Sequence, residues 1–276
     1  MSKTSSIVRF FYGTMPGRIL LKAIIKSHAE RLVILFLHSR CSHLVIAPYA
    51  KHHGIKLSQA EHDSYRTFRD FFTRSKDMVC IDGTPGHLIS PCDGWLSVHT
   101  IQKDSSFSIK GSHYRIADLL QDTKLADLFQ DGDCLIFRLC ASDYHHYCYI
   151  DDCYQGTNHF IPGILHSVQP IACETYPVYV LNRRSWTLLT TEHFGPVVQT
   201  EIGALVVGGI CNPRENLRAC RGQEKGHFEL AGSTIVLLFQ KGKIQLLPNI
   251  LEQLKYGEFR VHQGMWIGER LSQKQV

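Results

Sequence analysis

The sequence predicts an α+β protein in which a mainly antiparallel β body follows a set of N-terminal amphipathic helices. Residues 1–76 carry apolar side chains at helical spacing, whereas from about residue 87 short β-rich runs follow one another, separated by Gly, Pro, Asn and Asp. These runs do not alternate with helical segments, as the strands of a parallel βαβ fold would. A hydrophobic content of 44% and a charged content of 20% suit a packed core and argue against extensive disorder.

The first predicted helix begins near Pro16-Gly17, and its apolar residues gather on one side with basic residues between them. The apolar positions are Ile19, Leu20, Ala23, Ile24 and Ile25, and the basic ones are Arg18, Lys22 and Lys26. Further helices are predicted over residues 28–38 and 61–76, the last ending in Phe71-Phe72-Thr73-Arg74. We therefore expect residues 1–76 to form a helical, membrane-associating region and residues 77–276 to form a mainly β domain.

The charge distribution indicates an anionic partner surface. Residues 1–60 hold nine lysines and arginines and one acid, Glu30, although the whole chain has a net charge of only +5. Because these basic residues are interleaved with aliphatic runs, an anionic bilayer suits the segment better than nucleic acid, and no nucleic-acid partner is expected. The alternative is that these helices simply cover the core. The apolar run Leu32–Leu37 is too short to span a bilayer, so we expect a peripheral protein on the cytoplasmic side of the cell membrane.

The ten cysteines are scattered and form no CxxC pair, so neither a zinc site nor any other metal site is predicted. A signal peptide is not expected either, because polar residues and Arg9 interrupt the first residues of the chain. We therefore expect reduced thiols in a cytosolic environment.

Short runs rich in β-branched and aromatic residues predict the strands of the body. They are Leu96–Val98, Cys134–Leu139, Tyr147–Ile150, Tyr176–Leu181, Trp186–Thr190, Val197–Thr200, Ala204–Val207, Ile235–Phe239 and Ile244–Leu247.

The pair Gly232-Ser233 lies directly before the most apolar of these runs, Ile235–Phe239. Gly-Ser pairs are usually ordinary turns, but a corner of small residues before a buried strand can hold a serine backbone rigidly. An N→O acyl shift requires such a corner, because the Ser233 hydroxyl must approach the carbonyl carbon of Gly232 and glycine tolerates the twisted geometry best. Elimination and hydrolysis would then leave a pyruvoyl group, an electron sink that no ordinary side chain provides.

Activation of the serine requires a base and a group that orients it. Asp93 lies in the tight turn Ser90–Gly94, and His145 and His146 lie at the start of a predicted strand. A neutral histidine is the natural proton carrier near pH 7. These residues also have ordinary interpretations. Asp93 can be a turn aspartate that is hydrogen-bonded to its own backbone, and His145 and His146 can be structural histidines. For His166, which lies in an apolar run, a structural role is favoured over the alternative of a place in a substrate pocket.

Several segments resemble the phosphatidylserine decarboxylases, and they occur in the same order as in that family. They are Phe71–Arg74, Ser90–Gly94, Asp143–His145, Gly163–Pro170, Phe194–Pro196, Gly232–Thr234, and the spacing of Gly257, Glu258, Gly264 and Gly268. The likeness extends from about residue 8 to residue 270.

The resemblance implies cleavage between Gly232 and Ser233, which gives a β chain of residues 1–232 and an α chain of residues 233–276. Ser233 would become the covalent pyruvoyl group, and Asp93 and His145 would assist its formation. The α and β chains would then act together on phosphatidylserine in an anionic membrane through Schiff-base formation, loss of carbon dioxide and reprotonation to phosphatidylethanolamine. The oligomeric state stays open, with a homodimer as one possibility.

The sequence departs from the family pattern at three places. Cys148 stands where many members have a second histidine, so His145 must serve alone or share its work with His146, Cys148 or His166. Ala231 precedes the Gly-Ser pair where leucine or glycine is commoner, and Arg183 stands where an acid is common. Arg183 could alter a local ion pair or face a phosphate.

Two other functions remain open at this point. The substrate could be a free amino acid or another serine-headed lipid, because the chemistry is indifferent to what the serine carries. Alternatively, the chain could be a membrane-binding homologue that has lost activity, which the cysteine at position 148 would favour.

Overall fold

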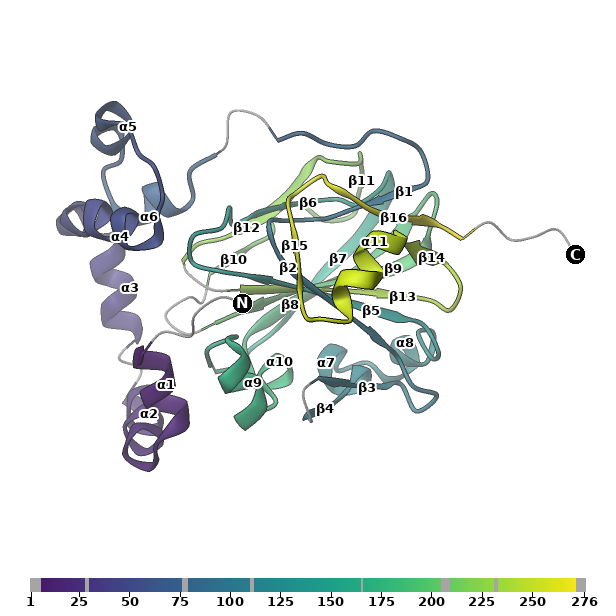
Figure 1. Ribbon diagram of the computed structural model, residues 1–276, viewed down its shortest axis with the longest axis horizontal. Coiled ribbons are helices and arrows are strands. Elements are labelled where there is room, and N and C mark those ends of the chain that lie inside the picture. The colour runs from purple at the N-terminus through teal and green to yellow at the C-terminus, as the bar shows by residue number, and fades with distance from the viewer. Residues whose placement is uncertain are drawn as a thin grey trace, which may run out of the picture.

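The computed structural model describes residues 6–27, 30–75, 79–109, 112–164, 166–204, 209–230 and 233–271. At its centre is an eight-stranded antiparallel sheet (Figure 1). In spatial order the strands are β11 (Leu217–Ala219), β7 (Cys153–Ile161), β8 (Arg184–Thr191), β9 (Gly195–Gly203), β13 (Ser233–Phe239), β5 (Asp133–Leu139), β2 (Gly94–Thr100) and β15 (Phe259–Val261).

Both faces of the sheet are buried, and strand β13 shows why. Its side chains alternate between two apolar clusters, with Ile235, Leu237 and Phe239 in one cluster and Val236 and Leu238 in the other. A strand that is buried on both faces reads as a continuous apolar run, which is how this segment appears in the sequence.

Short helices and a hairpin cover one face of the sheet, whereas two small sheets and a helix cover the other (Figure 1). The first group is β3 (Ser106–Ile109), β4 (Ser112–Arg115), α7 (Ile116–Leu120), α8 (Thr123–Asp127), α9 (Pro170–Thr175) and α10 (Val178–Leu181). The second group contains two three-stranded sheets and a helix. One sheet has the order β1 (His87–Ile89), β16 (Trp266–Arg270), β14 (Ile244–Leu246), and the other has the order β10 (Ile210–Cys211), β12 (Glu224–Phe228), β6 (His146–Cys148). The helix is α11 (Pro248–Leu254).

The N-terminal helices stand together on one side of the body, at the purple end of the chain in Figure 1. They are α1 (Ser6–Gly13), α2 (Met15–Ser27), α3 (Glu30–His38), the 3₁₀ helix η1 (Arg40–Val45), α4 (Ile46–His53), α5 (Gln59–Ser64) and α6 (Phe68–Phe72). Helices α4 and α6 form a third apolar cluster, which includes Leu230 of the body. Among the described residues no single helix is long and apolar enough to cross a membrane. One pair of helical segments, 31–38 and 40–53, reaches the required length and hydropathy when the two are taken together, but they are bent by 88° relative to each other.

The structure confirms the α+β class and corrects two of the predicted elements. The helix expected over residues 61–76 is two short helices, because Thr67 is extended and caps α6 through a hydrogen bond from the Asp70 amide to its side chain. The strand predicted over Tyr176–Leu181 is wrong. Pro177 instead precedes helix α10, where its fixed φ and missing N–H suit a helix start.

The boundary predicted between residues 76 and 77 falls in a segment outside the described residues, as does most of the predicted strand Ala204–Val207.

Candidate active site

Ser233 is the first residue of β13, which lies inside the eight-stranded sheet. It pairs with Gly203 of β9 on one side and with Leu139 of β5 on the other, and its side chain is fully buried. The backbone after Ser233 is therefore held by ladders on both sides. Gly232, the other half of the predicted cleavage site, lies outside the described residues.

The imidazole of His145 lies beside this hydroxyl, with its Nδ1 3.1 Å from Oγ of Ser233. The sheet register explains the contact. Strand β5 ends at Leu139, opposite Ser233, and the turn after it leads the chain back past the start of β13 into β6. His145 follows that turn and is only 1% exposed. The structure thus brings together the predicted base and the predicted nucleophile.

The second ring nitrogen of His145 fixes which tautomer is present. Its Nε2 lies 3.0 Å from the carbonyl oxygen of Cys140, and a carbonyl oxygen only accepts hydrogen bonds. Nε2 therefore carries the proton, and Nδ1 of the neutral ring accepts the hydrogen bond that the Ser233 hydroxyl donates. Burial lowers the pKa of His145 to about 4, against a smaller opposing effect of Asp143, so the ring is neutral at pH 7. This is the arrangement of a general base beside its nucleophile.

Asp143 holds the turn that presents the Cys140 carbonyl. Its Oδ2 accepts a hydrogen bond from the Cys140 amide at 2.7 Å, and its own amide donates to the Cys140 carbonyl at 2.9 Å. Arg260 donates to both carboxylate oxygens, at 2.7 and 3.1 Å. Asp143 is therefore a positioning residue to which the sequence analysis gave no role. An acid three residues after Cys140, in a tight segment before a candidate base, is the signal that could have revealed it.

Aromatic side chains of the N-terminal region and of β12 cover His145. The ring centroid of Phe72 lies 4.4 Å from that of His145, and Phe228 approaches the same ring edge-on at 6.4 Å. The guanidinium of Arg74 lies 4.6 Å from the centroid of the Phe71 ring and donates to the Phe71 carbonyl. The segment Phe71–Arg74 thus shields the base from water, which is the desolvation that keeps the ring neutral.

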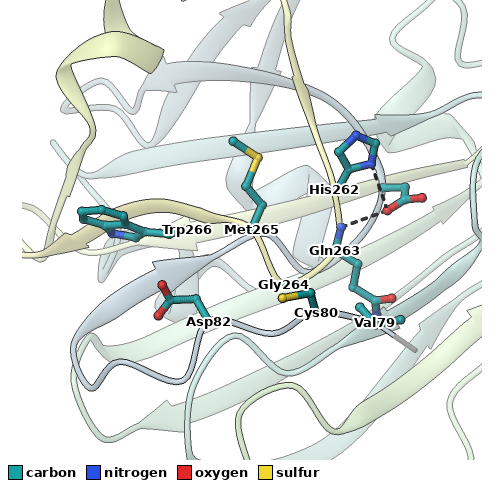
Figure 2. A pocket seen from close by; sticks show the side chains of 9 residues that line it. Val79, Cys80, Asp82, His262, Gln263, Gly264, Met265 and Trp266 are labelled. Atoms are coloured by element: carbon teal, nitrogen blue, oxygen red, sulfur yellow. Dashed lines mark hydrogen bonds and ion pairs between the residues drawn. The ribbon is translucent and has the colours of Figure 1, made fainter. Parts of the chain in front are cut away.

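Asp93 lines a pocket of about 520 Å³. Its Oδ1 accepts a hydrogen bond from the Gln263 amide at 2.9 Å and lies 3.7 Å from Nδ1 of His262. Figure 2 shows the pocket, which is also lined by Val79, Cys80, Asp82, Gly264, Met265 and Trp266. The two ring nitrogens of His145 contact Ser233 and Cys140, and the part that Asp93 takes in self-processing stays a prediction.

The remaining candidates near the base differ in what they offer. Burial raises the pKa of Cys148 to about 12, so this thiol stays protonated at neutral pH and supplies no base. His146 donates from Nε2 to the Thr73 carbonyl at 3.0 Å, and its ring stacks on Tyr144 with centroids 4.7 Å apart. His146 therefore contacts the end of helix α6.

His166 connects helix α1 to the sheet. Its Nδ1 lies 3.2 Å from the Tyr12 hydroxyl, and its backbone N–H donates to Asn182. The Asn182 amide in turn donates to the carbonyls of His166 and of Gly203, the partner of Ser233 in the ladder. Burial lowers the pKa of His166, which suits its role as an acceptor for the tyrosine.

The comparisons with known proteins agree on one family. The family described as phosphatidylserine decarboxylase matches residues 68–265 of the chain. A phosphatidylserine decarboxylase proenzyme 2 from Clostridium acetobutylicum is 40% identical over 266 residues, which is 95% of this chain and 91% of the relative. Phosphatidylserine decarboxylase proenzymes from Clostridium kluyveri (35% over 95% of this chain and 91% of the relative) and Desulfitobacterium hafniense (33% over 91% and 87%) are also similar.

Proposed function

The chain belongs to the phosphatidylserine decarboxylase family, and on that basis we propose that it converts phosphatidylserine to phosphatidylethanolamine with a pyruvoyl group made from its own Ser233. The observation that carries the self-processing part is the 3.1 Å contact between His145 Nδ1 and Ser233 Oγ in a buried, neutral pair.

In the first step His145 Nδ1 takes the hydroxyl proton of Ser233, and Oγ attacks the carbonyl carbon of Gly232. The C–N bond between these residues breaks as the nitrogen accepts a proton, which leaves an ester between Gly232 and the Ser233 side chain. The ladders on both sides of β13 support this step, because they hold the backbone of Ser233 while the hydroxyl turns toward its neighbour.

In the second step a base removes the Cα proton of residue 233, and the ester bond to its Cβ breaks. Gly232 leaves as the carboxylate end of the β chain, and the dehydroalanine at position 233 tautomerises to an imine. One water then replaces the nitrogen, which leaves as ammonia, so that the α chain begins with a pyruvoyl group. His145 suits the proton removal because it is neutral and already lies beside the side chain that must leave.

The surroundings of residue 233 suit a carbonyl cofactor. Once formed, the pyruvoyl group would supply the electron-accepting carbonyl for the decarboxylation. The side chain at this position is fully buried, and Phe72 and Phe228 surround the neighbouring base, so water is kept from the reacting atoms. His145 remains within reach to hold or return a proton.

The two chains would remain one body after cleavage. The α chain would begin with β13, which lies between β5 and β9 of the β chain and pairs with both over its full length. Strands β14, β15 and β16 also belong to the α chain, and β15 pairs with β2 of the β chain. Separation of the chains would expose β13, in which all seven residues are buried.

We further propose a peripheral position on the cytoplasmic side of an anionic membrane, and the N-terminal helices support the contact with the membrane. Apolar side chains on α2 and α3 face outward, including Ile19, Leu32 and Leu35, the last two 71% and 67% exposed. Basic residues on the same helices, such as Arg18 and Lys22, would meet the lipid phosphates. This position favours a lipid over a soluble amino acid as substrate.

Intact-mass measurement of the purified chain tests the proposal. We expect two fragments, 1–232 and 233–276, with the second lighter than its serine-ended form by 17 Da, about the mass of one ammonia. The Ser233→Ala variant should stay a single chain. A wild-type chain that stays intact, or an α chain that begins with an unmodified serine, would contradict the proposal.

The substrate is tested separately on the processed protein. We expect carbon dioxide release from phosphatidylserine vesicles, inhibited by hydroxylamine, and none from soluble serine or other free amino acids. Turnover of the soluble amino acids alone would refute the lipid assignment while leaving the self-processing proposal intact.

A further inference from the structure

Three potential metal ligands converge where β6 pairs with β12. They are His146, Glu224 and His227, and their ligand atoms all lie within 4.8 Å of one another. His146 and His227 are register partners in the antiparallel pair, and their rings stack with centroids 4.9 Å apart.

A β-bulge brings Glu224 to the same place. Residues three apart in a regular strand point to opposite faces, so Glu224 and His227 should be separated by the sheet. The register of the pair shifts between Glu224 and Gly226, and this extra residue restores both side chains to one face. Such bulges commonly re-aim a side chain next to a functional site.

The hydrogen bonds of His146 leave one ring nitrogen available as a ligand. Nε2 lies 3.0 Å from the Thr73 carbonyl, which only accepts, so Nε2 carries a proton and Nδ1 is the ring nitrogen that a metal ion could bind. Nδ1 lies 3.0 Å from Oε2 of Glu224, but the geometry forms no hydrogen bond, and this buried atom is without a hydrogen-bond partner among the described residues. A metal ion placed between these two atoms would be bound by both of them.

His227 repeats this situation. Its Nδ1 is also buried without a hydrogen-bond partner in the described part of the chain, and it lies 3.9 Å from Oε1 of Glu224. Its ring stacks on that of His146, so its Nδ1 lies on the same side of the strand pair as the other two ligand atoms. Two unpartnered imidazole nitrogens therefore face one carboxylate.

We propose that His146, Glu224 and His227 form a binding site for a divalent transition-metal ion, with Zn²⁺ as the best match. Two imidazoles and a carboxylate are a common zinc donor set. Tetrahedral ligands at about 2.0–2.1 Å from the ion lie about 3.3 Å from one another, which is close to the 3.0 Å between His146 Nδ1 and Glu224 Oε2. Glu224 is half exposed, so the ion can enter from solvent and keep a water as its fourth ligand.

The ion would join two strands and a helix next to the proposed base. His146 directly follows His145 and also contacts Thr73 at the end of α6, so a bound ion would fix β6, β12 and this contact together. The cysteine spacing could not indicate such a site, because its ligands are histidines and a glutamate that lie far apart in the sequence.

Calorimetric titration of the metal-free, full-length protein with Zn²⁺, in a form without a polyhistidine tag, tests the proposal. We expect one tight equivalent, which His227→Ala and Glu224→Gln each weaken at least ~10-fold. The matched control is His62→Ala, in the cluster His43, His62 and Asp63, where Nδ1 of His43 already lies 2.9 Å from the Tyr65 carbonyl. The control should bind as wild type does.

Two further measurements separate loss of ligands from loss of fold. The melting temperature of each metal-free variant shows whether it folds, and added Zn²⁺ should raise it in wild type and His62→Ala but not in His227→Ala. The Co²⁺ form should show the visible bands of nitrogen and oxygen ligation without a thiolate charge-transfer band. Three results would each overturn the proposal: wild type binds no Zn²⁺, folded His227→Ala binds it as wild type does, or His62→Ala loses it.

Discussion

The carbonyl oxygen of Cys140 lies 3.0 Å from Nε2 of His145, and this contact determines which ring nitrogen faces Ser233. In many triads a carboxylate orients the catalytic histidine and also stabilises its protonated form. Here a neutral carbonyl orients the ring, so the imidazolium gains less stabilisation, and burial further disfavours it. A weak base suits a single self-processing event in which the proton is held only briefly.

Replacement of His145 should abolish self-cleavage. We expect His145→Ala to slow the appearance of the two chains at least ~100-fold, because a positioned general base typically contributes that much. The control is His159→Ala, an exposed histidine that stacks on Trp186. Denaturing gels over time measure the conversion, and cleavage of His145→Ala at the wild-type rate would exclude the ring as the base.

The buried neutral ring of His145 should make folding stability depend on pH. Its folded pKa of about 4 lies below the ordinary histidine value of 6.5, so its contribution to stability is fully present above about pH 6.5 and decreases as the pH falls toward 4. Lowering the pH from 7 to 4.5 should therefore decrease the free energy of unfolding by about 2–3 kcal/mol through this group. The test is urea denaturation at several pH values of two uncleaved variants, Ser233→Ala alone and Ser233→Ala combined with His145→Asn. The free energy of unfolding should change less with pH in the double variant. Equal effects would mean that the folded pKa of His145 is not lowered.

Asp143→Asn tests whether the turn positions the base. Asparagine keeps an oxygen for the Cys140 amide but loses the charge that pairs with Arg260 at 2.7 Å. We expect cleavage to slow roughly 10-fold, since a loosened orienting group leaves the base in place but less often aligned. Arg260→Gln should slow it to a similar extent. In Asp143→Asn the pH at which cleavage declines should move lower, because the carboxylate raises the pKa of His145. An effect of Asp143→Asn without any effect of Arg260→Gln would argue against the ion pair.

The sequence could predict the apolar strand that follows Gly232-Ser233 and a candidate base in the segment Asp143–Cys148. It could not predict which atoms meet, because the contact of His145 with Ser233 depends on the register that places Leu139 opposite Ser233. The helix at Val178–Leu181 was missed for a similar reason: its residues favour a strand, and packing against the sheet decides otherwise. The convergence of Glu224 with His227 depends on a bulge that has no clear sequence signal.

Breaking the buried ion pair between β12 and β9 should strongly destabilise the protein. Lys225 Nζ lies 2.8 Å from Oε1 of Glu201, and both side chains are fully buried. Lys225→Met leaves the Glu201 charge buried without its cation, which should cost about 3–5 kcal/mol. The matched control is Lys241→Met, whose partner Asp131 is at 3.2 Å on the surface, and it should change stability by at most ~1 kcal/mol. Urea denaturation in the uncleaved Ser233→Ala background compares the two, and equal losses would show that burial of the pair has no energetic consequence.

The outward-facing leucines of α3 should determine binding to anionic vesicles. The double variant Leu32→Glu with Leu35→Glu removes two apolar anchors and adds two negative charges, so we expect at least ~10-fold weaker binding in a flotation or sedimentation assay. Deletion of residues 1–40 should weaken binding further, and higher salt should weaken the wild type because the basic residues contribute. Tyr256→Glu, at an 88% exposed apolar residue of the body after α11, is the control and should bind as wild type does. Equal binding of the leucine variant and wild type would show that α3 covers the body without touching lipid.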